Sequence, residues 1–374
     1  MKKIVSVIAI ILCLTATSIA QEYHRPFQFT FFYPVGTNGG ESTEYSSNFS
    51  FNLLFGMNHS VDGFELGGIF NYNKGGVRGA QIAGVMNFNN QASNGALIAG
   101  ALNYQKDDFI GLQLAAVNFN EGNYNGAQIG VVNYSRDFIG AQLGTITVAR
   151  DFRGAQMGTV SIAHDLVGAQ LGTVNIARDL NGAQIGTVNV AKSVKGTQIG
   201  IVNIMGENTG AIPVGIINVV KNGYYALELS SNEVMYSNLS FKMGVRKFYS
   251  IIKIGASLYD GEFINSYGFG FGGLFDIGRK TMLAVEGTSS QIVYEDNWGD
   301  DLSLLNRLDV NFQFELAKGF HLAVGPSFNV YVTDAPGNGE LGNLNIPYTF
   351  HDEIDGDYRV ASWVGANIGL VFEL

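Results

Sequence analysis

Few residues in this chain have the types and spacing that catalysis requires. The histidines are His24, His59, His164, His321 and His351, and no two of them have the spacing of a metal-ligand pair. The sequence contains no Gly-x-Ser-x-Gly elbow, no Walker loop and no His-Glu-x-x-His motif. His321 falls on the polar face of a predicted strand, so we interpret it as an interior side chain rather than a catalytic base. We therefore expect a protein that is not an enzyme and has no cofactor.

Two acidic stretches near the C-terminus have the carboxylates that calcium prefers. They comprise Glu295, Asp296, Asp300 and Asp301, and Asp352, Glu353, Asp355 and Asp357. Both stretches fall in links between predicted strands, where solvated carboxylates are common, and we favour that interpretation over a metal site. The formal net charge is −10, so nucleic acid is not an expected partner.

An internal repeat determines which elements position the remaining polar residues. Near-copies of fourteen residues begin at Gly126, Gly140, Gly154, Gly168, Gly182 and Gly196. Looser copies begin at Gly63, Gly79, Gly95 and Gly111, and a decayed copy begins at Gly210. The consensus is G-A-Q-(I/L)-G-T-V-N-(I/V)-A-(R/K)-D-(L/F)-x. A fixed period sustained over so many copies predicts a repeat architecture.

The copy from Gly168 to Asn181 predicts two short strands. Apolar residues alternate with Gln170 in its first half and with Asn175 in its second half, which is strand periodicity. The Gly-Thr step shifts the alternation, so that the apolar residues of the first half fall at odd positions and those of the second half at even positions. We expect stacked coils of a β-solenoid, because one coil cannot bury its apolar face alone. The residues expected inside are Leu171, Val174, Ile176 and Leu180.

A meander, with one strand and one turn per copy, is the alternative. The earlier copies allow it, since residues 80–88 alternate without interruption. The later copies do not, because the Gly-Thr step breaks their alternation. A meander would also place successive turns at opposite ends, where nothing would make them alike, yet the Arg-Asp corners are alike. We favour the solenoid.

Stacking would place equivalent residues in rows along the solenoid axis. Amide side chains in such rows hydrogen-bond from coil to coil. The candidate ladder on the repeat surface comprises Gln128, Gln142, Gln156, Gln170, Gln184, Asn133, Asn175 and Asn189. A row of Arg136, Arg150, Arg178 and Lys192 runs beside a row of aspartates, and opposite charges offset the repulsion within each row. We expect these rows to be solvated or mutually satisfied; a flat recognition surface is the alternative.

The segments outside the repeats predict export and a membrane barrel. Residues 1–20 have the basic start, apolar core and Ser-Ile-Ala cleavage site of a signal peptide. Two strands are expected in 21–62, and eight in 223–374, on either side of a repeat domain at 63–222. Their apolar faces alternate with polar ones, and short links alternate with long acidic ones, as in outer-membrane barrels of about ten strands. A soluble sandwich is the alternative. The fold class is therefore all-β, with a solenoid inserted in an antiparallel barrel.

A barrel of this kind would turn its polar residues toward the lumen. The candidate lumen-lining residues are Lys242, Arg307, Asp309, Gln313 and Glu315. Interiors of small barrels are largely filled by side chains.

The G-x-Q-(I/L)-G-x-V-N core, repeated from Gly79 to about Asn218, resembles a family of bacterial surface-repeat proteins found in spirochaetes and Bacteroidetes. The resemblance covers less than half of the chain and implies export and an envelope location, without a defined activity. We expect a non-enzymatic protein of the Gram-negative outer membrane, with lipid and an unknown envelope or extracellular ligand as partners. A small pore partly plugged by the repeats is the alternative, and a lipid enzyme lacks a visible nucleophile–base pair.

Overall fold

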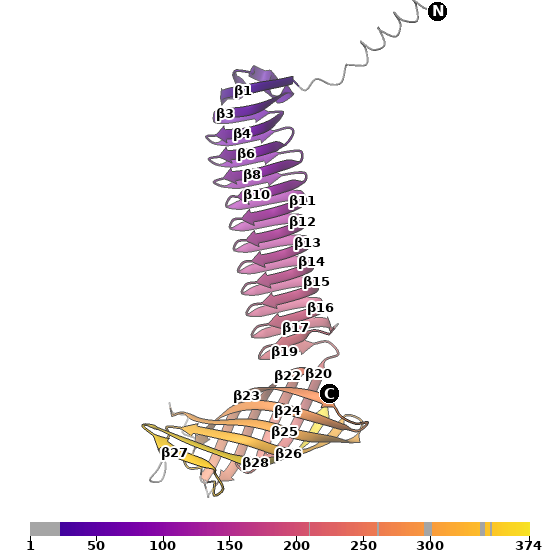
Figure 1. The fold of residues 1–374 in the computed structure, drawn as a ribbon, viewed down its shortest axis with the longest axis vertical. Helices are drawn as coiled ribbons and strands as arrows, with labels where there is room; N and C mark the ends of the chain where they lie inside the picture. The colour runs from indigo at the N-terminus through magenta and orange to yellow at the C-terminus, as the bar shows by residue number, and fades with distance from the viewer. Residues whose placement is uncertain (1–22, 209, 260–261, 295–300, 337–340, 345) are drawn as a thin grey trace, which may run out of the picture. The chain divides into compact units, whose positions relative to one another are not determined.

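The computed structural model describes residues 23–208, 210–259, 262–294, 301–336, 341–344 and 346–374. The expected signal peptide at 1–20 lies outside this range. The protein is all-β, with a parallel β-solenoid followed by a closed antiparallel barrel (Figure 1). The chain divides into two compact units, Met1–His164 and Asp165–Leu374. The described residues of the first unit form the earlier solenoid coils, and those of the second form the later coils and the barrel. No helix among the described residues is long and apolar enough to span a membrane.

The solenoid has about twelve turns, and its strands pair in parallel, coil on coil. Early coils have two strands each: β4 (Ser60–Gly67), β5 (Phe70–Asn73), β6 (Val77–Ala83), β7 (Met86–Asn89), β8 (Ser93–Ala99), β9 (Leu102–Gln105) and β10 (Phe109–Leu114). Later coils are interrupted only at the Gly-Thr corner: β11 (Val117–Ile129), β12 (Val132–Leu143), β13 (Ile146–Met157), β14 (Val160–Leu171), β15 (Val174–Ile185) and β16 (Val188–Ile199). The series ends with β17 (Val202–Asn208), β18 (Ile212–Val214) and β19 (Ile217–Val220). The solenoid prediction is confirmed, and the meander is not observed.

The glycine that opens each copy is required by the stacking. Gly154 has φ of +136° and pairs in register with Gly140. A Cβ at Gly154 would lie 1.9 Å from the carbonyl oxygen of Gly140. No L-residue with a side chain adopts this backbone readily, and none fits the space.

The expected interior of the coil was mostly wrong. Leu180 is buried, at 3 % exposed, but Leu171 and Ile176 are 39 % and 37 % exposed, and Val174 is half-buried. Gln170 and Asn175 are fully buried instead. The two strands face each other through their amide side chains, which hydrogen-bond along the axis, so the alternating aliphatic residues point outward. The expectation assumed that apolar side chains must face inward, and the amide ladder reverses this.

The first two strands belong to the solenoid, which corrects the expected barrel boundary of 21–62. β1 (Tyr23–Phe32) pairs in parallel with β3 (Tyr45–Asn58), and β3 pairs in parallel with β4 and β5. Between them lie β2 (Val35–Gly36) and a short 3-10 helix, η1 (Gly39–Glu44). The repeats therefore precede the barrel and are not inserted in it. Solenoid strands and barrel strands both turn apolar residues outward, so alternation alone did not distinguish the two kinds of strand.

The barrel closes with eight strands and not with about ten, because the two strands expected in 21–62 belong to the solenoid; the eight strands expected in 223–374 are all present. They are β20 (Tyr224–Asn232), β21 (Ser237–Val245), β22 (Phe248–Tyr259), β23 (Glu262–Asp276), β24 (Thr281–Tyr294), β25 (Ser303–Ala317), β26 (Phe320–Thr333) and β28 (Tyr358–Glu373). β20 pairs with β28 and closes the ring. β27 (His351–Asp355) pairs only with β28, as an extension beside the ring.

The outside of the barrel is apolar, and its interior combines polar residues with two buried apolar clusters. On β25, Asp309 and Gln313 are buried, whereas Leu308 and Phe312, which directly precede them, are exposed. β20 and β28 follow the same alternation, with Glu228 buried next to the exposed Leu229. This distribution is the reverse of a soluble β-sandwich, whose apolar faces pack together.

Candidate functional site

A buried ionic cluster lies inside the barrel. The Nζ of Lys242, on β21, donates hydrogen bonds to carboxylate oxygens of Glu228, on β20, and Glu286, on β24. The hydroxyl of Tyr249, on β22, donates to the same Glu286 oxygen at 2.6 Å. An isolated buried charge would be costly, and pairing of one lysine with two carboxylates offsets that cost. These four strands therefore present a buried, internally hydrogen-bonded group and not an exposed reactive one.

A second ionic cluster lies beside the first, because Asp309 on β25 pairs in register with Glu286 on β24. Arg307 donates to Asp309 at 2.9 Å and to Glu233 at 3.3 Å. Glu233 belongs to the link between β20 and β21, and its carboxylate also accepts hydrogen bonds from Asn329 Nδ2 at 3.0 Å and Trp363 Nε1 at 2.9 Å. The link thus folds back onto the interior of the barrel.

Apolar side chains pack around this inward-folded link. The cluster comprises Val234, Met235, Ile264, Ile292, Leu305, Tyr331, Leu344, Ile346, Ala361 and Trp363, all buried. It joins strand residues to residues of two links, at 234–235 and 344–346. The interior at this end is therefore filled by side chains of the chain itself.

Four of the five predicted lumen residues lie inside the barrel. Lys242, Arg307, Asp309 and Gln313 are buried. Glu315 is half-buried near the end of β25, where its backbone N–H donates to Lys280 at 2.9 Å. Glu315 lines a hollow of about 230 Å³ among the short turns, so it borders the turn end of the barrel and does not line the central interior.

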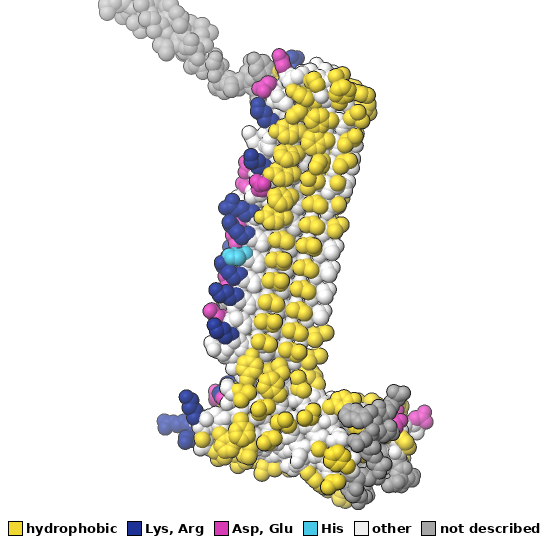
Figure 2. Space-filling view, turned by 180° about the vertical axis from the view of Figure 1, so that it is seen from behind, with side chains coloured by type: hydrophobic (Ala, Val, Ile, Leu, Met, Phe, Trp, Pro, Cys, Tyr) yellow, Lys and Arg dark blue, Asp and Glu magenta, His cyan; other side chains and the backbone are white. Residues whose placement is uncertain are grey.

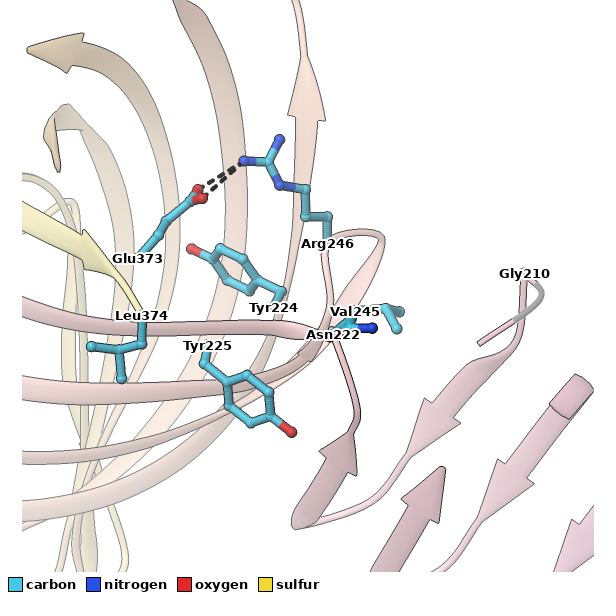
Figure 3. Close-up of a pocket in the computed structure, with 9 residues that line it drawn as sticks. Gly210, Asn222, Tyr224, Tyr225, Val245, Arg246, Glu373 and Leu374 are labelled. Atoms are coloured by element: carbon cyan, nitrogen blue, oxygen red, sulfur yellow. Dashed lines mark hydrogen bonds and ion pairs between the residues drawn. The ribbon is translucent and has the colours of Figure 1, made fainter. Parts of the chain in front are cut away.

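The turn end of the barrel carries a second open hollow, of about 370 Å³ (Figure 3). Arg246 donates to the Glu373 carboxylate at 2.8 Å and 3.1 Å along its wall. The buried His321 places Nε2 3.5 Å from the same carboxylate, in keeping with its interpretation as an interior side chain. Ionic pairing accounts for Arg246 and Glu373 without a ligand.

The predicted amide ladder exists, but it lies in the solenoid interior and not on the repeat surface. In the first unit, Gln128 donates to Gln113, Gln142 to Gln128 and Gln156 to Gln142, each at 2.8 Å. In the second unit, Gln184 donates to Gln170 at 2.7 Å, and Asn175 donates to Asn189 at 2.9 Å. All members, including Asn133, are fully buried. A ladder closed to solvent cannot be a recognition surface.

Glu65 interrupts the ladder with a fully buried carboxylate. Its Oε1 accepts hydrogen bonds from Asn52 at 3.0 Å and Asn58 at 2.6 Å. Its Oε2 accepts from Asn73 and Gln81, both at 2.8 Å. Burial raises the pKa of this carboxyl above its ordinary value, although the four amide donors act in the opposite direction.

The charged rows remain at the surface, along one corner of the coils (Figure 2). Arg150 Nη2 lies 3.0 Å from Asp137 and 3.2 Å from Asp151. In the second unit, Arg178 lies 2.6 Å from Asp165 and 2.7 Å from Asp179. Each arginine therefore pairs within its own coil and with the coil before it, as the adjacent rows predicted.

Several of these residues were missed in the sequence. Glu65 occupies the glutamine position of its looser copy, so an alignment of the copies contains the signal. Glu228 and Glu286 each lie at an inward-facing position of a strand, directly after an apolar residue. Glu233 lies in a link, where no periodicity marks it. Of the calcium candidates, Asp352 forms a paired hydrogen bond with Arg359, at 2.8 Å to each oxygen, and Glu295, Asp296 and Asp300 lie outside the described residues.

No family model, no curated protein and no solved structure matches the chain. The functional assignment therefore rests on the structural observations above.

Proposed function

We propose that this is a non-enzymatic outer-membrane protein of a Gram-negative cell envelope. The barrel is its anchor, and the solenoid is a domain carried for a structural or binding role. The resemblance of the repeats to bacterial surface-repeat proteins and the signal-peptide pattern at 1–20 agree with this proposal.

The outward apolar surface of a closed barrel is the observation that carries the proposal. Strands of nine to sixteen residues surround a polar interior. A tilted strand needs about 9–11 residues to cross a bilayer. A closed ring also leaves no unpaired strand edge in contact with hydrocarbon, where unsatisfied backbone groups are costly.

The ends of the barrel favour one orientation. Leu374 donates its backbone N–H to Tyr225 at 2.9 Å, so the last barrel strand ends where the first begins. The turns after β21, β23 and β25 are short and basic and lie at this same end of the ring. The links after β24 and β26 are longer and lie at the other end. Bacterial barrels have short periplasmic turns, so we assign the turn end to the periplasm.

Membrane fractionation with gel electrophoresis of heated and unheated samples tests the anchor. We expect the protein in the outer-membrane fraction, with faster migration before heating than after it. A protein that remains soluble after cell lysis and shows no mobility shift would exclude the barrel anchor.

A small pore is the second candidate, because the interior of the barrel is polar. An eight-stranded ring encloses little more than its own side chains, and the ionic clusters and the apolar cluster around Trp363 occupy it. We therefore rank the pore below the anchor. Planar-bilayer recordings separate the two: stable unitary conductance of the purified protein would favour the pore.

A further inference from the structure

One outward face of the coils carries apolar columns, drawn in yellow in Figure 2. In the first unit, one column runs in register through Leu66, Ile82, Ile98, Leu114, Ile129, Leu143 and Met157. A coil spacing of about 4.8 Å gives this column a length on the order of 34 Å. The column contains no charged residue.

The opposite side of each coil is apolar as well. Phe70, Met86, Leu102, Val117, Val132 and Ile146 form a second column. Beside it, the rings of Tyr72, Phe88, Tyr104, Phe119 and Tyr134 stack with centroids 4.4–5.7 Å apart. The two faces point away from each other, because their inward amides meet between them: Asn89 Nδ2 donates to Gln81 Oε1 at 2.8 Å.

These columns cover two opposed faces of the coils. Each column is about 7 Å wide along the strand and about 34 Å long, so one face carries roughly 240 Å² and the other, with two adjacent columns, roughly 480 Å². The largest apolar patch on a soluble monomer is about 300–600 Å². A rigid protein partner would cover one of the two opposed faces, whereas a fluid apolar phase covers both.

The two corners of each coil differ in polarity. The Gly-Thr corner of the first unit presents Ile69, Val85, Ala101, Ala116, Val131, Thr145 and Thr159, which are apolar except for the two threonines. The opposite corner presents the Arg-Asp ion pairs. The coil is therefore amphipathic across its section, as an element at a membrane interface is.

The size of the coil and its backbone pairing fit one leaflet. Strands β5, β7 and β9 have four residues each, or about 13 Å, close to half of a hydrocarbon core of about 30 Å. At the Gly-Thr corner, the N–H groups of Thr145 and Ile146 both donate to the carbonyl of Val131, at 2.9 Å. Burying this corner in hydrocarbon therefore leaves these two backbone donors satisfied.

We propose that the solenoid enters one leaflet of a lipid bilayer edge-on. The Gly-Thr corner lies among the acyl chains, and the Arg-Asp corner lies at the headgroups. This goes beyond the proposed function, because a barrel anchor does not require the solenoid that it carries to contact lipid.

Depth-dependent quenching of a fluorophore tests the insertion. Single cysteines replace Val131 at the Gly-Thr corner, Leu143 on the apolar face and Arg150 at the charged corner, each in the full chain with Cys13→Ser. A barrel position, Phe312→Cys, is the matched control for lipid contact, because it is exposed on the outside of β25. Each variant carries an environment-sensitive label and is reconstituted in phosphatidylcholine–phosphatidylglycerol vesicles containing nitroxide lipids. Retained heat-modifiable mobility and far-ultraviolet circular dichroism show that a variant has folded.

We expect the label at Val131 to be quenched about twofold more by a nitroxide near the chain end than by one near the headgroup. The label at Arg150 should show the reverse order, and the label at Leu143 should be quenched by both.

If Phe312→Cys is quenched but the solenoid labels are not, the insertion is overturned and the barrel anchor stands. If none is quenched, the anchor fails too. Efficient bismaleimide cross-linking between copies at Leu143, without quenching, would assign the face to a second copy and also overturn the proposal.

Discussion

Gln81 donates its side-chain N–H to the Glu65 carboxylate at 2.8 Å, deep inside the solenoid. Oε1 of Glu65 accepts two donors from β3 in the preceding coil, and Oε2 accepts Asn73 of its own coil and Gln81 of the next coil. A carboxylate accepts hydrogen bonds without donating any, whereas an amide must do both. Glu65 therefore occupies a point where amide donors converge.

Removing this acceptor should destabilise the first coils. Glu65→Ala removes the acceptor of one N–H group on each of four buried amides, and a buried N–H left unpaired costs about 1–3 kcal/mol. We expect a loss of at least about 3 kcal/mol in the unfolding free energy of the solenoid, measured by thermal circular dichroism in detergent. Glu41→Ala, in the exposed η1 segment, is the control. Equal melting of Glu65→Ala and the parent protein would contradict the role of the carboxylate.

The protonation of Glu65 should couple solenoid stability to pH. Its folded-state pKa is raised above the ordinary value of 4.5 by burial. The stability that it contributes is therefore fully present below pH 4.5 and is lost as the pH rises through the folded-state pKa. We expect the first coils to melt at a lower temperature above that pKa, and Glu65→Gln to reduce this dependence. The same pH dependence in Glu65→Gln would assign it to another group.

Neutralising the central lysine of the barrel should be costly. Lys242→Met leaves Glu228 and Glu286 buried side by side without their cation, and breaking a buried pair costs about 3–5 kcal/mol. The temperature at which gel mobility shifts should fall. The triple variant Lys242→Met, Glu228→Gln, Glu286→Gln should recover most of the loss, because no unpaired charge remains. Lys318→Met, at an exposed turn, should leave the transition unchanged; an equal fall there would point to a general effect of charge.

The repeat glycines should tolerate no side chain. Gly154→Ala places a Cβ against the Gly140 carbonyl oxygen in a left-handed backbone, with a combined cost on the order of 3 kcal/mol. We expect earlier melting of the solenoid and faster proteolysis near β13. Gly40→Ala is the matched control, because a Cβ there meets no atom within 4 Å. Indistinguishable proteolysis of the two variants would argue against the close stacking.

The sequence predicted the elements better than it predicted which way their side chains face. The repeat period and all eight barrel strands follow from glycine spacing and alternation, whereas the expected break at the Arg-Asp corner is absent, because β15 (Val174–Ile185) runs through it. Alternation is symmetric, however, and does not say whether Leu171 or Gln170 faces inward. The strand with which a given strand pairs is also distant in sequence. Phe29 and Phe51 were therefore assigned to the barrel, although they pair in register in the solenoid. The link residue Glu233 could not be predicted, because its partners Arg307 and Trp363 are distant in sequence and meet only when the ring closes.

The column of glycines has a consequence for how such a chain changes over generations. Each opening glycine contacts the equivalent glycine one coil away, and successive copies superimpose without a shift of register from Gly126 to Gly154. Recombination between neighbouring copies of the coding sequence can therefore add or delete a whole coil, and the two new neighbours meet through the same contacts. The number of coils can therefore change between closely related chains without any change at either end of the solenoid.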